Sequence, residues 1–303
     1  MNLKTTFLSI TLIASSLFAT AQVDTNKVDA QGRKQGYWVE NLGVTKWEGN
    51  YTDGLKQGVW ISHHYNGILD ELAVYKDNKR NGMNVNVDVN GYYKSEKSYK
   101  NDTIDGMSTE YAPGGKVSSQ IMYKMGKYNG VRKVYYNGGG IEEDGMYKNG
   151  SRNGVTKWYY QDGKIATRYT YVNDVREGGF ASYYENNNMI DTGSFKNNEY
   201  DGAYQKFFEN GNAEITGTYK NGKKIGEWKE YNEDGSELTT TKYDKDGNVS
   251  GKPKVQKLKV VEKSKDDDKS KGTDKAKDTP KPGAPVNNPT PSKTMVDDKT
   301  KKQ

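Results

Sequence analysis

An aromatic residue returns every 24 positions along most of this 303-residue chain. A fixed period of this length is typical of repeat architectures, in which each unit is stabilised by its neighbours. The period therefore constrains the fold more than any single motif does. The recurring positions are Tyr51, Tyr75, Tyr99, Tyr123, Tyr147, Tyr171, Phe195, Tyr219 and Tyr243.

Three more columns contain glycine or residues that readily enter a positive-φ conformation. Such columns indicate conserved backbone geometry within the repeat, and we predict that the first one forms structural turns. The first column, seven residues after each aromatic residue, is Gly58, Gly82, Gly106, Gly130, Gly154, Gly178, Gly202 and Gly226. The second is Gly67, Gly91, Gly115, Gly139, Gly163, Asn187, Gly211 and Gly235, and the third is Gly54, Asn78, Asp102, Gly126, Gly150, Asp174, Asn198 and Gly222.

The segments between these columns are rich in Tyr, Trp, Val, Ile and Thr and show no helical period. Two such segments per repeat, each bounded by a turn, predict one β-hairpin. Counting from Gly36, where a shortened first copy begins, gives about nine hairpins, or roughly 18 strands. The predicted fold is all-β: an elongated, single-layer, antiparallel β-hairpin repeat solenoid.

Aromatic residues form two further columns within the predicted strands. Because the columns are three residues apart, they should lie on opposite faces of the sheet. The first column is our candidate binding surface, although support of a single-layer sheet explains the same rings and is the favoured explanation. It contains Tyr111, Tyr135, Tyr159, Tyr183, Phe207 and Tyr231, and the second column contains Trp60, Phe180, Tyr204 and Trp228.

The pattern Y-K-N-G-x-x-x-G-x-W-x-x-Y-x-x-x-G is most complete at residues 219–235. It resembles the MORN-repeat variant of bacterial proteins, including the YwqK-type antitoxin family, over residues 33 to 250. Copies such as the one at residues 82–91 lack the aromatic pair. The resemblance implies a scaffold or interaction module in a bacterium.

Residues 1–21 have the features of a secretory signal peptide: Lys4, an apolar run from Phe7 to Phe18, and a small-residue site before Gln22. A retained anchor helix is the alternative. We assign residues 22–35 to an N-terminal lead-in and 36–251 to the repeat domain. There is no cysteine, which excludes disulfides, thiolate metal sites and a cysteine nucleophile.

Residues 252–303 form a Lys/Pro-rich tail that is predicted to be disordered, with 15 lysines against 8 acidic residues. A final capping strand around Val255, Leu258 and Val260 is an alternative for its start. The lysines predict weak, salt-dependent contact with anionic envelope polymers, and the acidic runs moderate that contact. The rest of the chain, without the tail and Lys4, contains 30 basic and 32 acidic residues.

Other candidate sites have simpler structural explanations. The Lys220–Gly226 loop lacks the helix of a phosphate-binding loop, and Asp244–Asn248 lacks the glutamate and helices of a calcium loop. His63 and His64 are adjacent on a strand and point to opposite faces, and the acidic cluster Ile141–Gly145 suits a solvated strand better than a glycosidase pair. We therefore predict no catalytic residues, metal or cofactor, and no nucleic-acid partner or transmembrane span.

Together these features predict a non-enzymatic, exported scaffold that binds protein partners in the envelope of a Gram-negative bacterium, such as an outer-membrane complex, in the periplasm or at the cell surface. The alternatives are a protein that binds envelope glycan or peptidoglycan through its aromatic rows, and an antitoxin or immunity-type binding protein.

Overall fold

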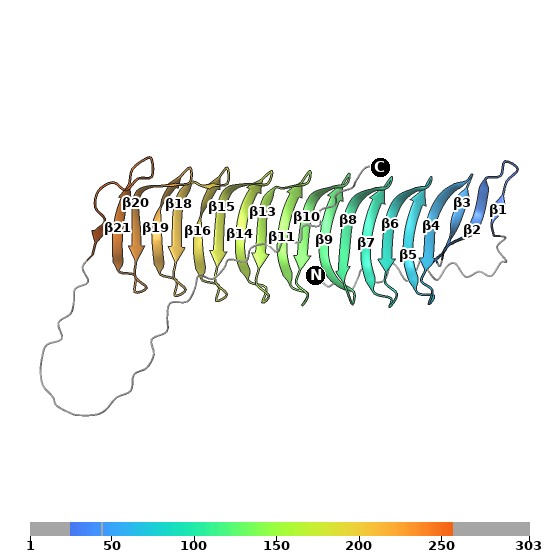
Figure 1. Cartoon of the computed structure of the whole chain (residues 1–303), viewed down its shortest axis with the longest axis horizontal. Coiled ribbons are helices and arrows are strands. Elements are labelled where there is room, and N and C mark those ends of the chain that lie inside the picture. Colours follow the sequence, from blue (N-terminus) through green and yellow to red (C-terminus); the bar gives the residue numbers. More distant parts are fainter. Residues whose placement is uncertain (1–24, 44, 257–303) are drawn as a thin grey trace, which may run out of the picture. The chain divides into compact units, whose positions relative to one another are not determined.

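The computed structural model describes residues 25–43 and 45–256, and all regular structure in this part is β-strand. Figure 1 shows the strands standing side by side in chain order. The strands are β1 (Lys27–Val28), β2 (Lys34–Leu42), β3 (Thr45–Thr52), β4 (Leu55–His63), β5 (Leu69–Lys76), β6 (Lys79–Val87), β7 (Tyr93–Lys100), β8 (Thr103–Ala112), β9 (Lys116–Lys124), β10 (Lys127–Tyr135), β11 (Ile141–Lys148), β12 (Ser151–Arg152), β13 (Gly154–Tyr159), β14 (Ile165–Val172), β15 (Val175–Tyr183), β16 (Met189–Lys196), β17 (Glu199–Tyr200), β18 (Gly202–Phe207), β19 (Ala213–Lys220), β20 (Lys223–Tyr231), β21 (Glu237–Tyr243) and β22 (Lys254–Val255).

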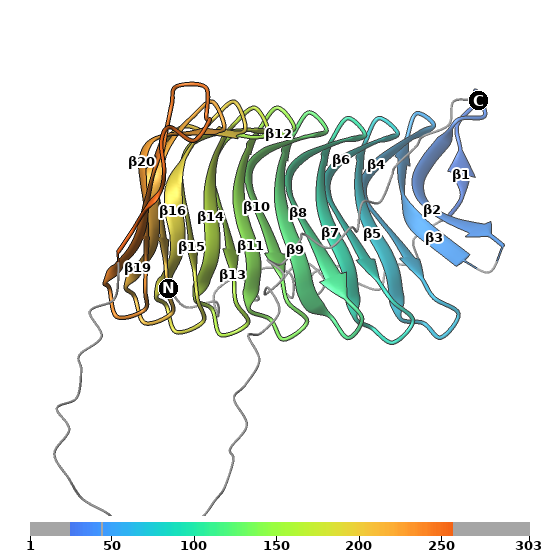
Figure 2. The same ribbon diagram turned by 60° about the vertical axis from the view of Figure 1, so that its left-hand side comes forward.

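Each strand pairs antiparallel with the strand that precedes it and the strand that follows it in the chain. Strands β12 and β13 are one interrupted strand, as are β17 and β18, because each pair lies against a single partner. When each interrupted strand is counted once and the two-residue flanking strands β1 and β22 are left out, 18 of the 22 strands remain. The predicted single-layer hairpin solenoid is confirmed, and the strands bend along their length (Figure 2).

The prediction that the first glycine column forms turns is wrong. These glycines lie inside or at the start of strands, where the pairing register shifts. On β4, for example, Glu48 pairs with Ile61 and Asn50 with Gln57, so that residues 58–60 lie opposite Gly49 alone. Such a bulge places its first residue at positive φ, and the column has φ values from 68° to 137°. Glycine is thus required at these positions by a bulge. The 24-residue period alone does not show whether a glycine column belongs to a bulge or to a turn.

The other two columns do occupy the turns, and every member has a positive φ. They also connect neighbouring hairpins. The backbone N–H of Asp102 donates to the carbonyl of Arg80 at 2.9 Å, and its carboxylate accepts from the Arg80 N–H at 2.7 Å. At the opposite end of the strands, the Tyr160 hydroxyl donates to the carbonyl of Tyr183 at 2.6 Å. The backbone bond of the Asp102 type recurs at every turn that its column forms at that end of the strands, and several of the turns at the other end are linked as well.

The core of the single layer lies mainly on one face of the sheet, which we call the aromatic face. Its most buried large side chains are Trp60, Phe180 and Trp228, none more than 3% exposed, with Tyr51 and Phe195 beside them. Large residues alternate with small ones on adjacent strands: Trp60 pairs with Ala73. We call the other side the opposite face.

The ends of the chain lie largely outside the described residues. This applies to the predicted signal peptide and to most of the predicted tail, including Leu258 and Val260. The tail's first residues do form a short capping strand, because Val255 pairs with Thr239 and Lys254 with Thr240.

Candidate interaction surfaces

A chain of touching aromatic rings crosses the aromatic face from β13 to β21. Ring centroids are 4.9 Å apart for Phe180 and Phe195, 4.4 Å for Phe195 and Tyr200, and 4.9 Å for Tyr200 and Tyr219. The chain continues to Trp228, 4.7 Å from Tyr219. Separations of 4.5–7 Å are favourable for aromatic pairs. These rings are mostly buried or half-buried, so the chain stabilises the sheet.

A column of cations lies beside the rings of the aromatic face, in five repeats five residues after the aromatic residue of the 24-residue period. Lys56 Nζ lies 3.9 Å from the centroid of the Trp60 ring, and the Arg176 guanidinium carbon 4.2 Å from that of Phe195. The sequence reasoning missed this column, although the constant spacing of five was a visible signal. Its cationic members are Lys56, Arg80, Arg152, Arg176 and Lys224, and Lys34 takes the equivalent place in the shortened first copy.

Carboxylates on the aromatic face occupy another repeated column and have unequal partners. Glu143 forms an ion pair with Arg132 at 2.6 Å, and Glu71 with Arg80 at 3.2 Å. The equivalent residue two repeats after Glu143 is Asp191, which accepts from the Tyr204 hydroxyl at 3.4 Å and makes no ion pair within the described residues. Burial raises the pKa of Asp191, although hydrogen bonds from Ser182 and Tyr204 act in the other direction.

The predicted tyrosine ladder lies on the opposite face, as the odd spacing indicated. The Tyr135 hydroxyl donates to Gln120 at 2.7 Å across that face, and burial together with Asp144 raises the pKa of Tyr135 and Tyr159. The ladder rings do not form a continuous stack: within the described strands their ring contacts are limited to Tyr111 with Tyr93. Across their hairpins the other five face non-aromatic residues: Ile141, Ile165, Met189, Ala213 and Glu237. All six ladder side chains are half-buried, which agrees with structural support, and their role in binding stays a prediction.

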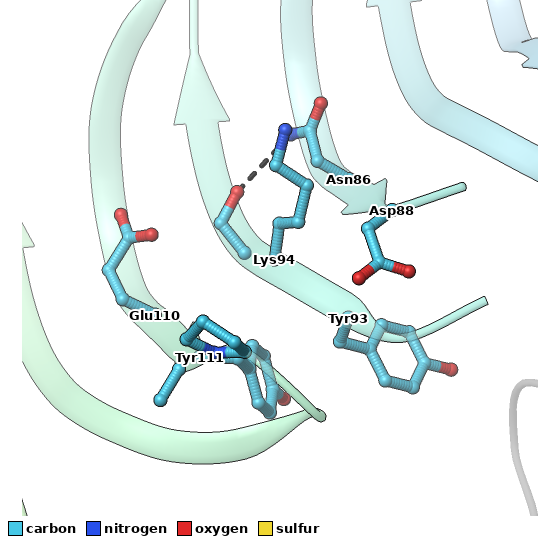
Figure 3. Close-up of a pocket in the computed structure, with 9 residues that line it drawn as sticks. Asn86, Asp88, Tyr93, Lys94, Glu110 and Tyr111 are labelled. Carbon is cyan, nitrogen blue, oxygen red and sulfur yellow. Dashed lines mark hydrogen bonds between the residues drawn. The ribbon is translucent and has the colours of Figure 1, made fainter. Parts of the chain in front are cut away.

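The one ladder contact lies in a shallow hollow of about 490 Å³ at the ends of β6, β7 and β8 (Figure 3). The rings of Tyr93 and Tyr111 have centroids 5.6 Å apart and planes tilted by 32°. This repeat has Val87 at the ladder position, and Tyr93 on the facing strand supplies the ring instead. Polar side chains complete the lining: Asn86, Asp88, Lys94, Ser95 and Glu110.

The other positions considered from sequence have structural partners. His64 Nε2 lies 3.0 Å from the carbonyl of Val87, and the Asp244 carboxylate accepts from the N–H groups of Asp246 and Asn248 within its own turn. No group of three or more His, Asp or Glu residues in the described part of the chain is arranged to hold a metal ion. Over the same residues, no helix is long and apolar enough to cross a membrane.

The match to a protein family agrees with this geometry. The model of the MORN repeat variant matches residues 152–173 and 200–221. The matches begin 48 residues apart, which is two periods. Each match begins at the repeat position of the cation column, which is Arg152 in the first match and Tyr200 in the second, and extends across a hairpin turn. No curated protein matches the sequence. The YwqK-type attribution stays a prediction, whereas the sequence period, the fold and the family match together identify the repeats of this chain as MORN repeats of the variant type.

Proposed function

We propose that this protein is an exported, non-enzymatic repeat scaffold that binds protein partners in a bacterial cell-envelope complex. The single observation that carries the proposal is the continuity of the sheet: 18 strands repeat one hairpin geometry, and no concentrated reactive site interrupts it among the described residues. Repeat sheets of this kind offer long binding surfaces that are built by translation of one unit.

The location rests on the N-terminal sequence. A signal peptide at residues 1–21 with cleavage before Gln22 would deliver the chain to the periplasm or to the surface of a Gram-negative cell. Cell fractionation and N-terminal sequencing of the mature protein test this part separately. A mature protein that is found in the cytoplasm with Met1 intact would contradict it.

The function is tested by crosslinking in the native envelope followed by affinity purification of the full chain. We expect a stable complex with defined protein partners at a fixed stoichiometry. Recovery of envelope glycan without protein would contradict the scaffold. A single small, toxic partner that is neutralised on binding would favour the antitoxin or immunity-type alternative.

A second function, glycan or peptidoglycan binding, is favoured by the hollow in Figure 3. Tyr93 and Tyr111 present adjacent rings beside Asp88, Lys94 and Glu110, and stacked rings flanked by polar groups suit a sugar face. Cell-wall pulldown with Tyr111→Ala and Tyr159→Ala tests this function. Loss of retention with the fold intact would support it, and unchanged retention would contradict a role for these rings.

A further inference from the structure

An exposed row of valine and methionine side chains crosses the opposite face from β4 to β13. Val74 establishes the face: it lies between Ala73 and Tyr75, which both contact Trp60 on the aromatic face. The exposed fractions are 38–45% for the five most accessible residues of the row. We define the Val/Met stripe as Val59, Val74, Met83, Met107, Met122, Val131, Met146 and Val155.

The bulge glycines leave this stripe uncovered. A Cβ atom on Gly82 would lie 2.9 Å from the Cβ of Val74, and one on Gly130 3.1 Å from the Cβ of Met122. Because glycine has no side chain, bare backbone lies beside each of these apolar residues. The result is a shallow apolar channel across the strands, and methionine side chains adapt readily to a bound partner.

A row of lysines runs beside the channel. Three of the lysines follow a stripe residue by two positions on the same strand, and Lys100 follows Ser98, which interrupts the stripe on β7, so all four point to the same face. All are exposed, and none makes an ion pair within the described residues, unlike Lys34 and Lys56 on the aromatic face. The four lysines are Lys76, Lys100, Lys124 and Lys148. Lys76, Lys79 and Lys100 also line a hollow of about 420 Å³ between adjacent turns.

The stripe stops in the second half of the sheet, and the lysine column is interrupted there before it returns as Lys196 and Lys220, of which Lys220 forms an ion pair with Asp201. The stripe positions become Gly179, Ala203 and Glu227, and the lysine position becomes Val172. Since the repeats keep their hairpin geometry there, the fold does not require an apolar stripe at these positions. An exposed apolar row with a charged border marks an interaction surface.

We infer that the Val/Met stripe and its lysine row bind an acidic amphipathic helix that lies across the strands. Equivalent lysines are two strand spacings apart, roughly 10 Å, and seven residues of α-helix rise about 10.5 Å. Carboxylates at every seventh helical residue therefore match successive lysines, while the neighbouring helix face covers the channel. An extended strand does not match the lysine spacing. Two of its residues that are about 10 Å apart are three positions apart in sequence, so their side chains point to opposite sides.

Charge distinguishes this partner from two other occupants. The chain's own segment 252–303 has a net charge of +7, which four unpaired lysines repel. Glu96 and Asp144 lie on the same face, two residues beyond the stripe on the side away from the lysines. A flat anionic membrane would meet these carboxylates, whereas a helix about 10 Å wide reaches only the stripe and the lysines.

The inference rests on the proposed scaffold function, and it is tested with a labelled synthetic peptide that has leucines on one face and a glutamate every seven residues. We expect saturable binding to the purified mature protein by fluorescence anisotropy, weakened about tenfold or more by Met107→Glu with Met146→Glu and by Lys100→Glu with Lys124→Glu. The matched control, Lys196→Glu with Ala203→Glu, alters the same positions outside the stripe and should change the affinity less than about twofold.

Thermal unfolding verifies that each variant is folded. In the unaltered protein, bound peptide should slow the oxidation of Met107 and Met146 by hydrogen peroxide, which keeps the test independent of folding defects. Equal binding of a peptide whose helix is broken by prolines would overturn the inference. So would stripe-dependent binding to phosphatidylserine vesicles in place of the peptide, or unchanged binding by the variants.

The envelope purification separates this inference from the proposed function. A native complex that survives Met107→Glu with Met146→Glu would overturn the inference alone. The absence of any protein complex would remove the scaffold function itself.

Discussion

The Trp60 indole covers Gly49 so closely that a methyl group at Gly49 would overlap the ring. The same relationship recurs between Trp228 and Gly217. In both places the tryptophan is the last residue of a bulge, and the glycine is the single residue that lies opposite this bulge. The large ring thus occupies space on the aromatic face that the adjacent strand leaves empty.

Gly49→Ala and Gly217→Ala should each reduce the free energy of unfolding by about 1–3 kcal/mol, because the indole must leave its position. Gly138→Ala is the control: no atom lies within 4 Å of its added Cβ, and its φ is not positive. Urea denaturation followed by tryptophan fluorescence measures the difference. Equal stability of all three variants would show that the rings shift without cost.

The hairpin solenoid could be predicted because its backbone requirements appear directly as residue types. Asn78 and Gly126 mark the same turn position, since few other residues enter positive φ cheaply. The bulge at Gly58 was mistaken for a turn because both geometries select glycine. The packing of Trp60 on Gly49 could not be predicted. The two residues are 11 positions apart in the sequence, and they lie side by side on adjacent strands only because the pairing register shifts between them.

Lys56→Met should destabilise the sheet by about 1 kcal/mol. The substitution keeps the aliphatic stem but removes the charge above Trp60 and the 3.5 Å ion pair with Glu40. Lys79→Met, at an exposed position of the following hairpin, should change stability by less than about 0.5 kcal/mol. Equal losses of stability in the two variants, measured by thermal denaturation, would mean that the charge of Lys56 above the Trp60 ring does not stabilise the sheet.

Asp102 tests the hydrogen bonds between neighbouring hairpins. Asp102→Gly keeps the positive φ of 64° but removes the acceptor for the Arg80 N–H, and should cost about 1 kcal/mol. Asp102→Ala removes the acceptor and adds backbone strain, so it should cost about 1 kcal/mol more. Hydrogen exchange of the Arg80 amide should accelerate in both variants, and unchanged exchange would contradict the assigned bond.

The candidate surfaces were less predictable than the fold. The tyrosine ladder was visible as a column, but its rings are half-buried and separated by residues such as Ile141 and Ile165. The aromatic residues of the period itself form most of the ring contacts, because bulges bring them next to Trp60, Trp228 and the cations. Strand alternation assigns a face, whereas contact across a bulge depends on register, which the sequence alone did not define.

Asp191 and Glu143 occupy equivalent positions and should respond oppositely to loss of charge. Asp191 makes no ion pair within the described residues, and burial raises its pKa above the ordinary 3.8 although Lys206 on the facing strand acts in the other direction. Its raised folded-state pKa favours the folded state below pH 3.8, and that contribution is lost as the pH rises through the folded-state value. Asp191→Asn should therefore be more stable than the unaltered protein at pH 7, and the gain should diminish as the pH falls through the folded-state pKa and be lost below 3.8.

Glu143→Gln provides the matched comparison. It leaves the partly buried Arg132 guanidinium without its 2.6 Å carboxylate partner and should lower stability at pH 7 by about 2 kcal/mol. Urea denaturation of both variants at pH 7 and at pH 3.5 measures the two effects. Destabilisation by Asp191→Asn at pH 7 would mean that the hydrogen bonds from Ser182 and Tyr204 outweigh the cost of the buried charge.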